Sequence, residues 1–210
     1  MKFIVLISGR GSNLSAIINA INANLLTANL VGVISDNPEA PGLQHCVANG
    51  IPVSVVEKKS YMDRPRFERV LQKAVDSYNP ELIVLAGFMQ VLSAEFVKNN
   101  LNKIINIHPS LLPKFKGLNT HQRALKANEK YHGASVHFVT PEIDGGPVIA
   151  YSKVLIDAAD NATSLAAKVL AKEHMLYPMV IQWFANGTVN CKGQDIFLNN
   201  LLLTNGGLEV

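Results

Sequence analysis

Cysteine is scarce in this chain of 210 residues, and its scarcity excludes two classes of protein. The two cysteines, Cys46 and Cys191, lie in opposite halves of the sequence. They predict neither a disulfide-stapled fold nor a zinc site built on cysteine pairs. Four histidines also show no metal-ligand spacing: His45, His121, His132 and His174. We therefore expect no metal, and two free thiols in a reducing, cytoplasmic compartment.

Long apolar runs and clusters of one charge are missing as well. The N-terminal run Phe3–Ile7 has five residues and ends at Ser8-Gly9, so it is too short for a membrane span or a signal peptide. Nineteen basic and sixteen acidic residues give a net charge of +3, and the basic residues do not gather in any one segment. This pattern predicts neither a membrane nor a nucleic-acid partner, and it suits small phosphorylated or carboxylated ligands.

What the chain does contain is a regular alternation of strand-like and helix-like segments. Its first half predicts strands over 2–8, 30–35, 52–56, 82–86 and 104–108, with helices over 14–24, 43–49, 67–78 and 93–99. The 82–86 segment has no polar residue, as expected when both faces of a parallel sheet are covered. We predict an α/β fold, a mostly parallel twisted sheet with helices on both faces. Its ligands should lie beyond the carboxyl ends of the strands.

The second half predicts a different pattern. Strands over Gly133–Val139 and Pro147–Val154 are expected to form an antiparallel hairpin at the sheet's edge, joined by the turn Asp144-Gly145-Gly146. A long helix over Thr163–Phe184 and a strand over Val189–Cys191 follow, and the tail from Asn199 gives no signal. We expect one domain over residues 1–187, with a C-terminal strand and tail over 188–210 packing on it or trailing from it.

A loop of small residues, Ser8-Gly9-Arg10-Gly11-Ser12-Asn13, connects the first strand to the first helix. Backbone N–H groups and the helix N-terminus can bind an anion there. The loop is not the dinucleotide fingerprint, because Leu14 stands where the third glycine would be, and it is not a Walker motif. The alternative is a plain turn in which Ser12 or Asn13 caps the helix.

A second pattern combines polar side chains on one face of a strand. Asn106 and His108 are two residues apart, so they point the same way, and an amide beside an imidazole can bind an oxyanion and move a proton. Ser135 and His137 likewise share a face. Asp144 precedes two glycines, and by itself it would be interpreted as a turn former.

Together these pieces resemble a known family. Asn106-Ile107-His108-Pro109-Ser110, followed by Asp144-Gly145-Gly146-Pro147, is similar to the signature of the folate-dependent formyltransferases, which have a Rossmann-like fold. The Ser8–Asn13 loop narrows the resemblance to the phosphoribosylglycinamide formyltransferases, over essentially residues 1–187. The resemblance implies transfer of a formyl group from 10-formyltetrahydrofolate to phosphoribosylglycinamide in purine synthesis, by a monomer or a homodimer.

The resemblance also implies roles for individual residues. Asn106, His108 and Asp144 would be catalytic, with Ser135 and His137 in support. The residues implied to bind the phosphate and the glycinamide are Gly11, Ser12, Asn13 and Glu173. Those implied to bind the folate are Arg64, Met89, Gln90, Val91, Leu92, Asn106, Val139 and Ile143.

The implied mechanism is direct attack of the substrate amine, because no serine or cysteine stands beside a base. Asn106 and a protonated His108 would bind the oxyanion. Asp144 would raise the pKa of His108, and Ser135 would hold a water molecule.

Two departures and three alternatives stay open at this point. Gln90 stands where relatives commonly have a basic residue, and Asn119 stands where a histidine is common. One alternative is a formyltransferase of the same superfamily that acts on methionyl-tRNA or a sugar amine. The others are a dinucleotide-dependent oxidoreductase, disfavoured by Leu14 and Ser35, and a non-catalytic phosphosugar-binding module.

Overall fold

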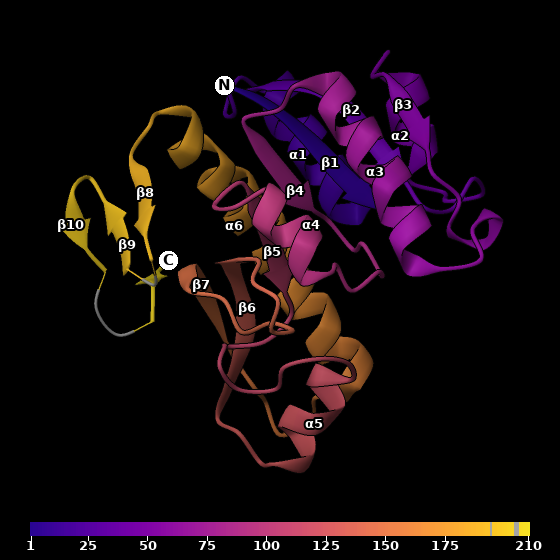
Figure 1. Ribbon diagram of the computed structural model, residues 1–210. Helices are drawn as coiled ribbons and strands as arrows, with labels where there is room; N and C mark the ends of the chain where they lie inside the picture. Colours follow the sequence, from indigo (N-terminus) through magenta and orange to yellow (C-terminus); the bar gives the residue numbers. More distant parts are fainter. Residues whose placement is uncertain (194, 204–205) are drawn as a thin grey trace. The chain divides into compact units, whose positions relative to one another are not determined.

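The chain forms two compact units, residues 1–105 and 106–210. The computed structural model describes residues 1–193, 195–203 and 206–210 (Figure 1). The fold below is given for each unit by itself.

The first unit contains a parallel sheet with the strand order β4-β1-β2-β3. Its strands are β1 (Lys2–Ile7), β2 (Asn29–Ser35), β3 (Val53–Val55) and β4 (Leu82–Leu85). Its helices are α1 (Ser12–Asn22), α2 (Leu43–Ala48), the short 3-10 helix η1 (Lys58–Ser60), α3 (Arg64–Tyr78) and α4 (Ala94–Asn99). The predicted alternation of strands and helices is confirmed in this unit.

The core of the first unit lies on both faces of this sheet. Successive residues of a strand point to opposite faces, yet Phe3, Ile4 and Val5 of β1 are all fully buried. The four residues of β4 are buried as well. Both faces of the central strands are therefore covered, as an apolar parallel strand requires.

The ends of the helices follow from local hydrogen bonds. The helix predicted over 93–99 is α4, and Ser93 caps it, since its side chain accepts a hydrogen bond from the Phe96 N–H. The helix predicted to begin at Phe67 begins three residues earlier, at Arg64. Asp63 caps α3 by accepting from the Arg66 N–H, and a proline in the first turn is compatible with a helix start.

The second unit contains an antiparallel hairpin of β6 (Tyr131–Phe138) and β7 (Val148–Leu155). The strand β5 (Ile104–His108) is the neighbour of β6. The helix α6 (Ala162–Ala185) packs on β6 and β7, and its start is fixed by a capping box between Asn161 and Ser164. The hairpin and the long helix are confirmed.

The predicted position of the hairpin at the sheet's edge is wrong. The strand β11 (Leu208–Glu209) from the C-terminal tail pairs with β7 in parallel, with Leu208 opposite Ala150. A strand of two residues has no periodicity in the sequence, so only its long-range pairing reveals it.

The rest of the second unit comprises the helix α5 (Thr120–Lys126) and a small antiparallel sheet in the order β10-β9-β8. Its strands are β8 (Val189–Lys192), β9 (Asp195–Leu198) and β10 (Leu201–Leu202). The sequence predicted β8 but not α5, β9 or β10. Within the described residues, no helix is both long and apolar enough to cross a membrane.

Candidate active site

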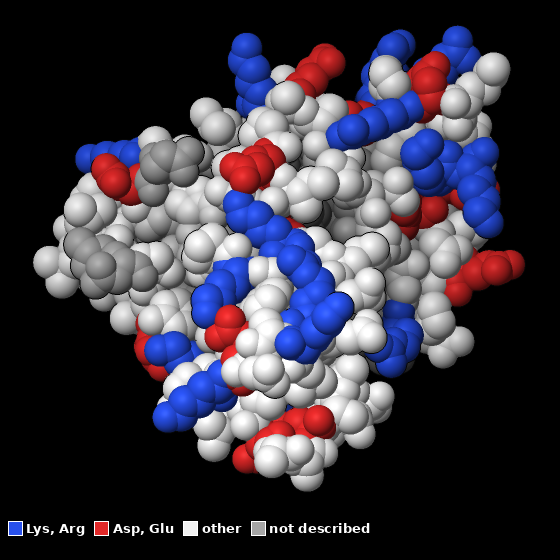
Figure 2. Space-filling model, turned by 90° about the horizontal axis from the view of Figure 1, so that it is seen from below, with Lys and Arg blue, Asp and Glu red and all other residues white. Residues whose placement is uncertain are grey.

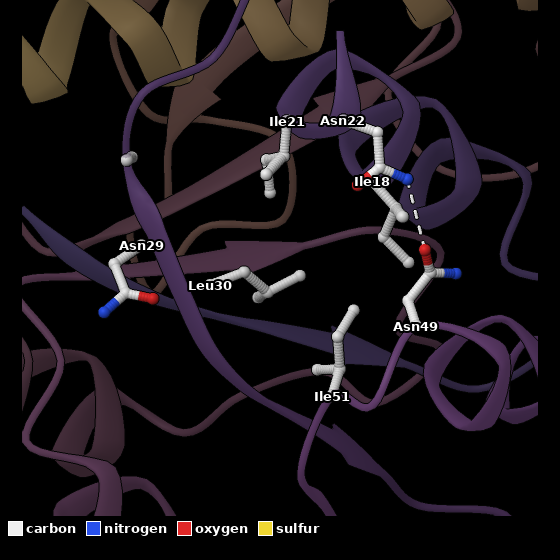
Figure 3. A pocket seen from close by; sticks show the side chains of 8 residues that line it. Ile18, Ile21, Asn22, Asn29, Leu30, Asn49 and Ile51 are labelled. Carbon is white, nitrogen blue, oxygen red and sulfur yellow. Dashed lines mark hydrogen bonds between the residues drawn. The ribbon is translucent and has the colours of Figure 1, made fainter. Parts of the chain in front are cut away.

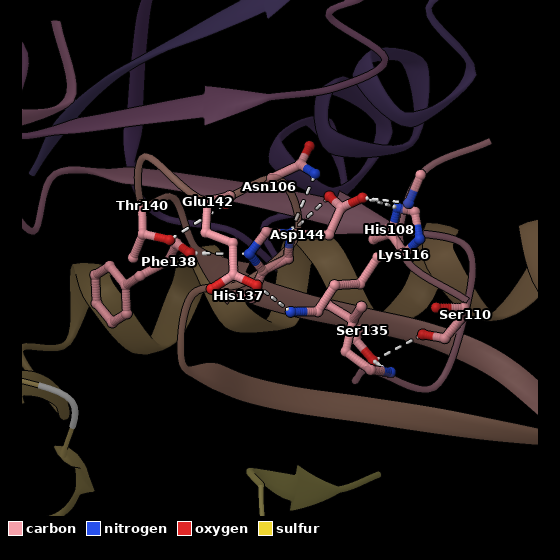
Figure 4. A network of polar contacts seen from close by, with 12 residues as sticks. Asn106, His108, Ser110, Lys116, Ser135, His137, Phe138, Thr140, Glu142 and Asp144 are labelled. Carbon is pink, nitrogen blue, oxygen red and sulfur yellow. Dashed lines mark hydrogen bonds and ion pairs between the residues drawn. The ribbon is translucent and has the colours of Figure 1, made fainter. Parts of the chain in front are cut away.

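The second unit brings together the three side chains that the sequence singled out as catalytic (Figure 4). Asn106 and His108 project from β5, and Asp144 comes from the connection between β6 and β7. His108 Nδ1 lies 3.3 Å from Asp144 Oδ2. Asn106 Nδ2 lies 3.2 Å from Nε2 of His137, whose Nε2 is in turn 3.6 Å from Asp144 Oδ1. Residues from β5 and from positions up to 38 residues further along the chain thus form one cluster.

The backbone of Asp144 adopts an unusual conformation, with φ at +48°, in the left-handed region. Asp and Asn tolerate this region better than other residues with a side chain, so the turn-former interpretation is right for the backbone. The side chain does more than shape the turn, because Oδ2 accepts a hydrogen bond of 2.9 Å from the Gly117 N–H and faces His108. The glycine two positions later is required by packing, since a Cβ on Gly146 would lie 1.9 Å from the Phe138 carbonyl oxygen.

Asp144 is a carboxylate in this environment. Burial by itself would raise its pKa, but the hydrogen bond from the Gly117 N–H and the charge of His108 help to bring the pKa below its ordinary value. The negative charge next to His108 is therefore present at neutral pH.

Burial lowers the pKa of His108, although the hydrogen bond to Phe115 and the charge of Asp144 both act to raise it. The sequence predicted the direction of the Asp144 effect, but not that desolvation would exceed it. His108 Nε2 lies 3.0 Å from the Phe115 carbonyl oxygen, and Nδ1 faces the Asp144 carboxylate. Both oxygens can only accept, so a neutral ring can donate to one of them and the protonated ring can donate to both. These two contacts therefore favour the protonated ring against the effect of burial.

Ser135 supports the loop after β5. Its hydroxyl donates to the Ser110 carbonyl oxygen at 2.8 Å and accepts from the Leu112 N–H at 3.1 Å. The side chain is fully buried and its hydrogen is already used. This geometry gives Ser135 a structural task in holding the loop after β5, and the water-holding role stays a prediction.

The loop between β1 and α1 in the first unit is held by backbone contacts. Gly11, with φ at +72°, is the N-cap of α1 and accepts from the Ser15 N–H, and no side chain caps the helix. Neither Ser12 nor Asn13 caps the helix, so the capping residue expected for a plain turn is wrong. A Cβ on Gly11 would lie 2.7 Å from the Gly42 Cα, whereas a Cβ on Gly9 would meet nothing within 4 Å.

The residues implied to bind the folate from the first unit lie in one connected region. The Arg64 Nε donates to the buried Glu68 carboxylate at 2.9 Å, and the same carboxylate oxygen accepts from the Ser93 N–H. Met89 and Val91 expose their side chains, while Leu92 is buried. The Met89 N–H donates to Ser8 Oγ at 2.8 Å, which ties this segment to the glycine-rich loop.

Gln90, the departure from the family pattern, has a partner of its own. Its Nε2 donates to Oδ2 of the buried Asp36, at 2.6 Å, just after β2. The side chain of Gln90 is thus held by the protein.

In the second unit, Glu173 is buried at 7% exposure on α6. A solvated surface charge, the ordinary interpretation of a helix glutamate, is therefore excluded. Val139 and Ile143 lie in the connection between β6 and β7, and Ile143 is half exposed. Lys116 and Glu142 form an ion pair of 2.7 Å there, which the sequence gave no signal for (Figure 4).

Two histidines of the second unit pack against each other. The rings of His121 and His132 meet edge to face with their centroids 5.2 Å apart, and His132 is 1% exposed. Burial and the neighbouring His121 lower the pKa of His132 to about 4. This residue is therefore neutral in the folded protein at pH 5, where it would be charged in the unfolded chain.

We expect the protein to lose stability on acidification because of His132. The folded state binds fewer protons than the unfolded state between the two pKa values, so the stability is lost as pH falls from about 6.5 to about 4. His132→Leu should remove about 2 kcal/mol of the drop in unfolding free energy between pH 7 and pH 5. Urea denaturation of both proteins at the two pH values measures this. An equal drop in parent and variant would contradict it.

Two further features bear on ligands. In the first unit a pocket is lined by Ile18, Ile21, Leu30 and Ile51, beside a hydrogen bond from Asn22 to Asn49 (Figure 3). It contains none of the predicted site residues. No group of three or more His, Cys, Asp or Glu in the described ranges has the arrangement of a metal site.

Comparison with known proteins shows the family of this chain. Residues 1–181 match the formyl transferase family, and the chain belongs to that family. The phosphoribosylglycinamide formyltransferase of Escherichia coli (strain K12) is 45% identical over 187 residues, which cover 89% of this chain and 88% of that protein. The protein of the same name from Haemophilus influenzae is 38% identical over 206 residues, 98% of this chain and 97% of the relative.

A solved structure gives the same result for the fold. The phosphoribosylglycinamide formyltransferase of Coxiella burnetii superposes on this chain with a TM-score of 0.96 at 44% identity. The superposition covers 100% of this chain and 98% of the Coxiella chain. The predicted fold class, a Rossmann-like formyltransferase fold, is confirmed.

Proposed function

We propose that this protein transfers the formyl group of 10-formyltetrahydrofolate to the amine of phosphoribosylglycinamide. The observation that carries the proposal is the cluster of Asn106, His108 and Asp144 in a chain of the formyl transferase family. A binding module would have no use for an amide, an imidazole and a carboxylate that converge at the end of one strand. The relatives of this chain from Escherichia coli and Haemophilus influenzae are named phosphoribosylglycinamide formyltransferase.

The reaction follows from what these side chains can do. The substrate amine attacks the formyl carbon, and the carbonyl oxygen becomes an oxyanion. Asn106 Nδ2–H and His108 Nε2–H donate to this oxygen, the latter in exchange for its bond to the Phe115 carbonyl. The bond from the formyl carbon to N10 of the folate then breaks, and the amine's proton moves to N10. Asp144 stabilises the imidazolium as the proton is transferred.

The remaining residues bind the substrates in this proposal. Glu173 receives the glycinamide amine, and Gly11, Ser12 and Asn13 bind the phosphate with their backbone N–H groups and the α1 N-terminus. The folate contacts Arg64, the segment 89–92, Asn106, Val139 and Ile143. Residues 1–187 act as one functional domain, and the free thiols suit a cytoplasmic enzyme.

The charged residues of the surface bear on the kind of partner. Figure 2 shows both basic and acidic side chains on the face that it draws. This face therefore lacks the uniform basic character that is typical of a nucleic-acid interface.

The decisive experiment mixes the protein with both substrates and follows the absorbance of the folate product. Formation of formylated phosphoribosylglycinamide is the expected result. Turnover of a methionyl-tRNA or a sugar amine in its place would contradict the proposed acceptor. No turnover with any acceptor would contradict catalysis itself.

The glycine-rich loop offers a test of phosphate binding. We expect Gly9→Ala to raise KM for phosphoribosylglycinamide by roughly tenfold or more, because a methyl group enters the open space beside the loop. Stability should be unchanged. Gly11→Ala should instead destabilise the protein, since its Cβ would collide with the Gly42 backbone and its φ is positive. Steady-state kinetics and thermal unfolding measure the two effects, and an unchanged KM for Gly9→Ala would contradict the loop's role.

A further inference from the structure

The side chain of His137 has two hydrogen-bond partners that together determine its protonation. Nδ1 lies 2.8 Å from the carbonyl oxygen of Phe138, and Nε2 lies 3.2 Å from Asn106 Nδ2 (Figure 4). A carbonyl oxygen can only accept, so Nδ1 must carry the proton of the neutral ring. Nε2 is then a bare acceptor. Its distance of 3.6 Å to Asp144 Oδ1 is too long for a hydrogen bond.

This protonation state determines which way the Asn106 amide points. An amide has a donor end and an acceptor end of nearly equal shape, and its hydrogen-bond partners decide between them. Only the NH₂ end can approach a bare Nε2 favourably. One hydrogen of Asn106 Nδ2 is therefore used by His137. Within the described part of the chain, this amide nitrogen has no second partner, so its other hydrogen remains for a ligand.

We infer that His137 is a positioning residue, which presents the N–H end of Asn106 to the developing oxyanion. The inference rests on the proposed function, because Asn106 is the oxyanion donor there. His137 is well placed for the task, since it is 2% exposed and is held on β6. Without it the amide could rotate and turn its oxygen toward the oxyanion, where it would repel the charge.

Two substitutions test the contacts of the two ring nitrogens separately. In His137→Gln, the longer side chain can place an acceptor oxygen near the position of Nε2 and retain the contact to Asn106. In His137→Asn, the shorter amide can donate to the Phe138 carbonyl oxygen but does not reach Asn106. A role in packing alone would also favour Gln, which is closer to His in size. The double variant and the NMR signals of Asn106 therefore separate positioning from packing.

We expect His137→Asn to lower kcat by roughly 10–50-fold, with KM for both substrates changed less than threefold. His137→Gln should remain within about fivefold of the parent. Because His137 acts through Asn106, adding His137→Asn to Asn106→Ala should cost less than about threefold more, a strongly non-additive result. Thermal unfolding establishes that each variant is folded.

A spectroscopic measurement tests the contact without turnover. In ¹⁵N NMR of the parent, His137 should show the Nδ1–H tautomer, and the Asn106 side-chain amide signals should shift in His137→Asn but less in His137→Gln. The opposite tautomer would overturn the inference, and so would equal kcat losses in Gln and Asn or an additive double variant. If the parent formylates no acceptor, the proposed function fails, whereas the NMR result still decides the contact.

Discussion

Asp144→Asn is expected to lower kcat by roughly 10²–10⁴-fold while the protein stays folded. Asparagine preserves the size of the side chain, tolerates the positive φ of this position and can still accept from the Gly117 N–H. What it removes is the negative charge 3.3 Å from His108 Nδ1. The imidazolium that forms during proton transfer then loses its stabilising partner.

The same variant should lower the pKa of His108 further. Burial already lowers this pKa, and the charge of Asp144 is one of the effects that oppose burial. Removing that charge moves the pKa in the direction of burial, so at any fixed pH near it a smaller fraction of His108 is protonated. Steady-state kinetics and an NMR titration of His108 measure the two consequences.

Asp157→Asn is the matched control for this variant. Asp157 is a carboxylate of the same unit, ion-paired with Lys168 on the surface and outside the site, so its substitution should leave kcat unchanged. If Asp144→Asn keeps kcat within threefold of the parent, or leaves the His108 titration unmoved, then Asp144 shapes the turn and nothing more.

Asn106→Ala is expected to lower kcat by roughly 10²–10³-fold, the usual effect of removing one oxyanion donor. The side chain projects from β5 and is half buried, and one of its amide hydrogens is held by His137. Truncation leaves the strand's backbone pairing intact, so the variant should fold. Because the lost hydrogen bond strengthens as the oxyanion forms, kcat should fall more than substrate affinity.

Asn190→Ala provides the control, because Asn190 is an exposed asparagine on β8, away from the proposed chemistry. Kinetics with both substrates and urea unfolding of the three proteins are the measurements. A loss of affinity with an unchanged kcat would show that Asn106 binds the folate and does not take part in the chemical step.

The parallel architecture could be predicted because the first unit is built from local patterns. The run Phe3–Ile7 and the segment 82–86 are apolar on both faces, which identifies a covered parallel strand wherever it occurs. The cap at Ser93 was likewise predictable, because a cap involves residues three apart. The two-residue strands β10 and β11 could not be predicted, because two residues show no periodicity and the strands are defined by their pairing with β9 and β7.

The site, like the fold, has features that the sequence predicted and contacts that it did not. The spacing of Asn106 and His108 on one strand predicted that they share a face, and the resemblance placed Asp144 with them. Two of the contacts that shape their chemistry come from backbone atoms, the Phe115 carbonyl oxygen and the Gly117 N–H. Every residue except proline has both groups, so no residue type marks these positions in a sequence.

The sequence by itself determined the identity of the reacting groups, the strand that presents two of them, and the family. Only the tertiary structure decided the protonation of His108, whose pKa is lowered by burial more than it is raised by the charge of Asp144. It also decided that the Gln90 side chain is held by Asp36. It also decided that Gly11 is required because the Gly42 backbone lies against it. The physical reason is the distance along the sequence over which each effect acts. A residue's type and its near neighbours fix its chemistry and its local conformation, whereas desolvation and close approach depend on which distant segments the fold places around it.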